Sequence, residues 1–127
     1  MSKHLIPRPT DAELEILQVL WQRGPSTVRE VNEVLSDRRE VGYTTTLKLM
    51  QIMVEKGLAR RNTETRVHVY TAAVEEAATQ QRLLDQFLDT AFRGSAASLI
   101  MQALGNHRAS PEELDEIKEL IRRMEEE

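Results

Sequence analysis

The stretch that decides the fold is residues 42–70, which read GYTTTLKLMQIMVEKGLARRNTETRVHVY. Its first half has the spacing of a helix, because Thr46, Met50 and Met53 recur on one face at offsets of 4 and 7. Gly57 follows at a position where the end of a helix favours a left-handed residue. We therefore predict a helix over this first half, with its apolar face turned towards a core.

A basic β-hairpin is predicted directly after this helix, with strands over residues 58–62 and 66–70. Alternation along the second strand predicts that its basic and aromatic side chains share one face: Arg66, His68 and Tyr70. The same rule allows only one of the adjacent residues Arg60 and Arg61 to face a ligand that lies along the hairpin.

The exposed face of the helix has the side chains that duplex DNA accepts. Hydroxyl groups and a cation bind phosphates, and an amide reads base edges. The arginines of the hairpin would then lie along the DNA backbone, whereas Tyr43 could equally pack against the protein, and a merely solvated helix face is the other interpretation. The predicted DNA contacts are Tyr43, Thr44, Thr45, Lys48, Gln51, Arg60, Arg61 and Arg66.

Two further helices are predicted before this stretch. Thr10 with Glu13, and Thr27 with Glu30, have the spacing of capping boxes, in which side chains bind the free amides of a first helical turn. Three helices followed by a hairpin is the order of a winged helix-turn-helix. We predict a mainly α fold with a small β-wing, in which residues 1–72 form the DNA-binding domain.

Residues 73–127 are predicted to form a helical dimerisation domain. Three helices are indicated, at 75–92, at 96–104 and after Ser110. Their apolar faces are too wide for so short a segment to cover alone, and a second copy is the simplest partner, although folding back on the same chain is the alternative. The predicted dimer contacts are Leu84, Phe87, Leu88, Phe92, Leu99, Leu114, Ile117 and Ile121.

The charge of the chain is divided unevenly. Residues 1–71 hold 11 Lys and Arg against 9 Asp and Glu, a net +2, whereas residues 72–127 hold 6 against 12, a net −6. A mildly basic DNA-binding region followed by an acidic dimerisation region would explain this division, although an acidic C-terminal part could also serve solubility alone. A DNA-binding domain with so little positive charge would bind DNA poorly as a single copy.

Composition excludes several classes of protein. The chain has no cysteine, so disulfides, thiolate metal sites and cysteine nucleophiles are excluded. The three histidines are scattered without ligand spacing, and no catalytic arrangement or phosphate-binding glycine loop can be argued. We therefore expect no enzyme, no metal and no cofactor. Without a long apolar run or an apolar N-terminal stretch, a soluble cytoplasmic protein is expected.

Six short motifs follow one another over almost the whole chain, at residues 9–21, 42–45, 55–58, 69–70, 94–99 and 110–114. In this order they resemble the penicillinase repressor family. That family includes the repressors of β-lactamase and methicillin resistance and those of copper transport. The resemblance implies a homodimeric repressor of transcription bound to a palindromic operator.

The resemblance also implies an input that releases the repressor from DNA. The copper-responsive members use a cysteine cluster, which this chain lacks. The β-lactam members are cleaved in response to a membrane sensor-protease, which makes such a protease a candidate partner. The bond matching their cleavage site falls at Gln102–Ala103, which differs from the family's Asn–Phe pair.

The alternative function is a winged-helix module that binds proteins and has no affinity for DNA. The charge of the predicted recognition helix separates the two hypotheses. Reversing that charge with Lys48→Glu should abolish retention on DNA under the first and change nothing under the second.

Overall fold

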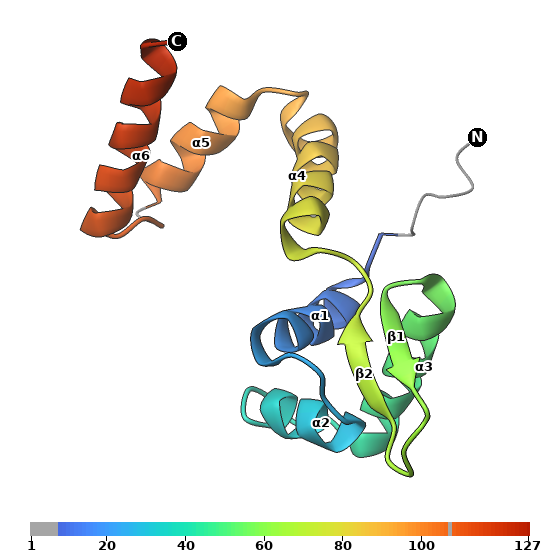
Figure 1. The fold of residues 1–127 in the computed structure, drawn as a ribbon. Coiled ribbons are helices and arrows are strands. Elements are labelled where there is room, and N and C mark those ends of the chain that lie inside the picture. Colours follow the sequence, from blue (N-terminus) through green and yellow to red (C-terminus); the bar gives the residue numbers. More distant parts are fainter. Residues whose placement is uncertain (1–7, 107) are drawn as a thin grey trace, which may run out of the picture. The chain divides into compact units, whose positions relative to one another are not determined.

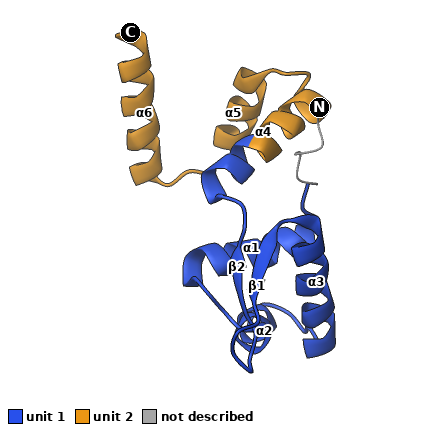
Figure 2. Cartoon of the chain, turned by 45° about the vertical axis from the view of Figure 1, so that its right-hand side comes forward, with its two compact units in different colours: residues 1–81 blue, residues 82–127 orange. Residues whose placement is uncertain are grey.

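The computed structural model describes residues 8–106 and 108–127. Within them the predicted class is confirmed, since the chain is mostly helical with one small antiparallel sheet (Figure 1). The chain divides into two compact units, Met1–Gln81 and Arg82–Glu127 (Figure 2). In order, the elements are α1 (Asp11–Arg23), α2 (Val28–Ser36), α3 (Tyr43–Lys56), β1 (Ala59–Asn62), β2 (Val69–Ala72), α4 (Glu76–Phe92), α5 (Ala96–Gly105) and α6 (Pro111–Glu125).

The first two helices begin where their capping boxes predict. The backbone N–H of Thr10 donates to Glu13 Oε1 at 2.9 Å, and the N–H of Glu13 donates back to Thr10 Oγ1 at 3.2 Å. Thr27 and Glu30 repeat the exchange at 2.9 and 3.1 Å. These bonds satisfy amides that the first turn of a helix leaves without partners, and so they set the start of α1 and α2.

One aliphatic core joins α1, α2, α3 and the hairpin. As predicted, α3 turns Thr46, Met50 and Met53 inwards, each at most 1% exposed. These side chains meet α1 and α2 because the three helices and the sheet pack against one another. The buried hydrophobic residues of this core are Ile16, Leu17, Val19, Leu20, Val28, Val31, Leu35, Met50, Met53, Leu58, Ala59 and Tyr70.

The predicted second wing strand was wrong by several residues. It begins at Val69, not at residue 66, and pairs with β1 in the antiparallel register that places Arg61 opposite Tyr70. Tyr70 is buried, and its backbone N–H and C=O bond to Ser26 at 2.8 and 3.0 Å. This tertiary anchor sets the register, so Tyr70 packs in the core and residues 63–68 form the loop between the strands.

The end of α3 follows the prediction for Gly57. Its φ of 85° and ψ of 12° are left-handed, and its N–H bonds to the carbonyl groups of the last helical turn. A residue with a Cβ would be strained in this conformation. The glycine thus lets the chain turn directly from α3 into β1, which keeps the wing close to the helix.

The second unit contains the rest of α4 together with α5 and α6, and both later helices start at the predicted serines. Ser95 caps α5, and Ser110 forms a capping box with Glu113. None of the described residues from 82 to 127 is buried. The large hydrophobic side chains that this unit leaves exposed are Leu84, Phe87, Ile100, Met101, Leu114, Leu120, Ile121 and Met124.

Candidate nucleic-acid interface

The outer face of α3 is polar and open to solvent. Thr44, Thr45, Lys48 and Gln51 are exposed, as is Tyr43 at 51%. Gly42 precedes the helix as its N-cap residue and provides no side-chain cap, and the first turn contains no acidic residue. Its free amides therefore add positive potential next to the hydroxyl groups, a combination that favours a phosphate.

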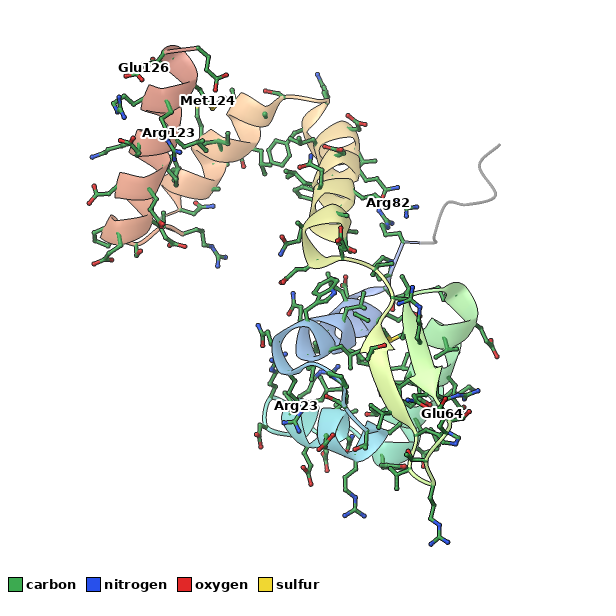
Figure 3. All side chains as sticks on the ribbon, viewed as in Figure 1. Arg23, Glu64, Arg82, Arg123, Met124 and Glu126 are labelled. Carbon is green, nitrogen blue, oxygen red and sulfur yellow. The ribbon has the colours of Figure 1, made fainter. Side chains whose placement is uncertain are left out.

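A groove of about 580 Å³ runs between this face, the start of α2 and the wing. In Figure 1 the hairpin lies beside α3, and Figure 3 labels Glu64 in the loop that joins the wing strands. No aspartate or glutamate is among the lining residues. These are Thr27, Val28, Arg29, Tyr43, Leu47, Gln51, Arg61, Arg66, Val67, His68 and Tyr70.

The structure brings some of the predicted DNA contacts together and separates others. Tyr43 and Gln51 from α3 meet Arg61 and Arg66 from the wing in the same groove. The other predicted side chains are exposed but lie outside it: Thr44, Thr45, Lys48 and Arg60. Of the two adjacent arginines, Arg61 is therefore the one that shares the groove, and Arg60 alternates to the other side of β1.

The other seven groove residues were not predicted as DNA contacts, among them Thr27, Arg29 and His68. Arg29 is the most informative, because it is exposed in the first turn of α2, where a positive charge opposes the helix dipole. This unfavourable charge in the first turn of a helix was the sequence signal that could have pointed to Arg29. Its significance depends on the wing lying beside the start of α2, which is a tertiary feature.

The cations of this surface differ from the other cations of the N-terminal unit in their ion pairing. Arg23 pairs with Glu30 at 3.1 Å, and Glu15 holds Arg38 at 3.9 Å and Arg39 at 2.5 Å. Five other cations lie on the outer face of α3, at the start of α2 or on the wing, and none of the ion pairs between described residues uses them: Arg29, Lys48, Arg60, Arg61 and Arg66. Glu15 and Glu30 therefore neutralise arginines elsewhere in the unit and leave these five cations available to a ligand.

Lys56 fixes the C-terminal end of α3 against α1. Its Nζ donates to Glu13 Oε1 at 2.7 Å, and the Glu13 side chain is only 3% exposed. Burial alone would raise the pKa of Glu13, but the bonds from Lys56 and Thr10 outweigh it and lower the pKa below its usual 4.5. Glu13 is thus charged at neutral pH and serves both as a helix cap and as an anchor for α3.

Asn32 holds the other end of α3. Its Nδ2 donates to the carbonyl oxygen of Val41 at 3.0 Å and to Thr46 Oγ1 at 2.9 Å. Thr46 is fully buried, so this bond gives a polar group inside the core a partner. Asn32 and Lys56 together set the orientation of the helix whose outer face is polar.

The predicted dimer contacts all lie on the helices of the second half of the chain. Leu84, Phe87, Leu114 and Ile121 are exposed, and the other four are partly buried: Leu88, Phe92, Leu99 and Ile117. Phe87 and Phe92 form an edge-on ring contact with centroids 5.6 Å apart. A second apolar hollow lies between α5 and α6 and includes Leu104, Ile117 and Leu120.

The described residues offer no sign of a metal site or a membrane segment. Within residues 8–106 and 108–127, no three His, Asp or Glu side chains are grouped to bind a metal ion. In the same ranges every helix is too short or too polar to cross a bilayer.

Comparison with known proteins gives concordant results. The family described as "Penicillinase repressor" matches residues 9–123. The penicillinase repressor of Bacillus licheniformis is 28% identical over 116 residues, which cover 91% of each chain. The solution structure of monomeric B. licheniformis BlaI in complex with the blaP half-operator matches 57% of this chain and 88% of that one, with 32% identity and a TM-score of 0.50.

A broader likeness shows the fold alone. A crystal structure of a MarR mutant from Escherichia coli matches 91% of this chain and 77% of that one, with 17% identity and a TM-score of 0.53. The predicted winged-helix class agrees with these neighbours, and the resemblance inferred from the sequence motifs is confirmed by the family match.

Proposed function

Since the chain belongs to the penicillinase repressor family, we propose that it represses transcription by binding operator DNA through its N-terminal unit. The observation that carries this proposal is the cation pattern. Glu30 pairs with Arg23, and Glu15 pairs with Arg38 and Arg39, whereas no ion pair between described residues uses Lys48 on the exposed face of α3 or the arginines of the wing. The relative solved on its half-operator, at 32% identity, supports DNA as the ligand. In this proposal the chain acts by binding DNA and catalyses no chemical step.

In this proposal α3 enters the major groove. Lys48 binds a phosphate or a guanine, Gln51 reads a base edge, and Thr44 and Thr45 donate to phosphates. Their exposure on one helical face supports this assignment. Arg60, Arg61 and Arg66 bind the DNA backbone from the wing, and the groove lined by Arg61 and Arg66 supports the role of those two in particular.

The repressor acts as a homodimer on a palindromic operator. The support is the apolar surface of the second unit, where eight large hydrophobic side chains are exposed. Each such side chain contributes roughly 1.5–3 kcal/mol when fully buried, which is ample for a stable interface. Two weakly binding DNA-binding domains joined in this way bind neighbouring half-sites at high effective concentration. In this proposal residues 1–72 read DNA, residues 73–127 dimerise, and the protein works in the cytoplasm.

A membrane sensor-protease remains the proposed partner for release. Gln102 and Ala103, which match the family's cleavage position, are exposed near the end of α5. Because proteases bind extended chains, cleavage at this bond would require the end of α5 to unwind.

Lys48→Glu tests DNA binding most directly. The wild-type chain and the variant would be titrated against a labelled duplex taken from the promoter upstream of its own gene, with fluorescence anisotropy as the readout. We expect Lys48→Glu to abolish binding, because a carboxylate would face the phosphates, and Lys118→Glu on α6 to retain it as the matched control. Wild-type affinity should also fall by about 0.9 log units per phosphate contact for each decade of salt.

The competing function, a protein-interaction module, predicts a different result. In that case the wild-type chain would ignore promoter duplexes even in dilute buffer, and Lys48→Glu would behave like Lys118→Glu. Either outcome would contradict the repressor proposal.

A further inference from the structure

We infer that the groove between α2, α3 and the wing holds one sugar-phosphate strand of the duplex, and that Arg29 at the start of α2 binds a phosphate of that strand. The inference rests on the proposed DNA-binding function and adds a third contact segment to α3 and the wing. It concerns the shape and charge of the backbone and is independent of the operator sequence.

The lining of the groove fits this occupant chemically. Arg29 stands on the α2 side, and Arg61 and Arg66 stand on the wing side. Apolar side chains lie between them, among them Val28 and Leu47. A nucleic-acid strand alternates anionic phosphates with largely apolar sugar edges, so arginines on the walls and apolar groups between them match both parts.

The state of the three arginines supports the same occupant. All three are exposed, and among the described residues none of them is held by a carboxylate. Three unpaired guanidinium groups around one groove repel one another, and no acidic residue lines the groove to relieve that repulsion. A phosphate strand would satisfy them all with charge-assisted hydrogen bonds.

Arg29 in particular is better explained by a ligand than by folding. Lying in the first turn of α2, it works against the helix dipole, which favours an acid there. When a phosphate binds, the same dipole attracts the anion together with Arg29, and the conflict becomes an advantage. No ion pair between described residues uses Arg29 in the folded chain, so its charge is available to such an anion.

The test is the salt dependence of binding to a 30-base-pair duplex of mixed sequence, since backbone contacts do not require the operator. The wild-type chain and Arg29→Gln would be titrated between 50 and 200 mM salt. Loss of one phosphate contact should lower the slope of log K against log salt by about 0.9. The fourfold rise in salt should therefore weaken the variant about 3.5-fold less than wild type. Combining Arg29→Gln with Arg61→Gln should remove about two units of slope.

Arg38→Gln is the matched control. Arg38 follows the other end of α2, is also exposed, and does not line the groove. It should keep the wild-type slope, and circular dichroism should show that every variant is folded. If Arg29→Gln kept the wild-type slope while Lys48→Glu lost binding, the Arg29 inference would be overturned and the repressor proposal would stand. If wild type bound no duplex at all, the proposed function itself would fail.

Discussion

Replacing Lys56 by methionine should destabilise the N-terminal unit strongly, even though Lys56 lies at the end of a helix and is partly exposed to solvent. The change removes the ammonium group 2.7 Å from Glu13 Oε1 and leaves a carboxylate that is 3% exposed without its counter-charge. Breaking a buried pair from one side costs about 3–5 kcal/mol. Because Thr10 N–H still donates to the orphaned carboxylate at 2.9 Å, we expect about 2–3 kcal/mol here.

The assay is urea unfolding at pH 7, followed by the fluorescence of Trp21. Trp21 is the single tryptophan of the chain, and its Nε1 donates to the carbonyl oxygen of Val74 at 2.9 Å, so its signal reports on this unit. With a typical slope of about 2 kcal/mol per molar urea, the midpoint should fall by roughly 1–1.5 M. Adding Glu13→Gln to the variant should recover part of the loss, because no buried charge then remains.

The dependence on pH provides an independent check. In wild type the pKa of Glu13 lies below 4.5, so the stability from the pair is complete above pH 4.5 and is lost as the pH falls through the lowered pKa. In Lys56→Met, burial should instead raise the pKa of Glu13, so protonation relieves the penalty. The deficit of the variant should therefore shrink between pH 7 and pH 4.

A midpoint shift below about 0.3 M urea, or an equal deficit at both pH values, would refute this reasoning. The first result would mean that water screens Glu13 despite its burial. The second would mean that the loss comes from packing of the Lys56 chain and not from charge.

Three other changes test the remaining parts of the structure. Asn32→Ala should lower the free energy of unfolding by about 1–2 kcal/mol, measured in urea, because the buried hydroxyl of Thr46 loses its donor; an unchanged midpoint would contradict this role. Gly57→Ala should cost about 1–2 kcal/mol in the same assay, since open space surrounds the added Cβ and only the φ of 85° is strained; a neutral result would exclude a left-handed residue there. Phe87→Asp or Leu88→Asp should give monomers by analytical ultracentrifugation, with weakened operator binding; dimers surviving both changes would refute the proposed interface.

The start and end of most helices could be predicted from local chemistry. Thr10, Thr27 and Ser110 each form the capping box that their sequence spacing indicates, and Gly57 takes the left-handed conformation expected after α3. These features depend on residues three or four apart in the chain, so the sequence contains all the information they need.

The wing was harder to predict because its register depends on distant partners. The alternation of residues 66–70 is compatible with a strand, but the backbone of Tyr70 bonds to Ser26, more than forty residues away. With Tyr70 buried and bound to Ser26, the strand pairs with β1 only from Val69 onwards. A pattern of period two cannot distinguish registers that differ in long-range contacts.

The sequence by itself determined the helical order, the polar face of α3, the apolar faces of the second half of the chain and the family. All of these follow from local periodicity, capping and motif spacing. Only the tertiary structure decided which cations are free to meet a ligand. Glu15 reaches Arg38 and Arg39 across the fold, and Arg29 joins Arg61 at one groove. Charges act through space, so their pairing is settled by packing and not by their order along the chain.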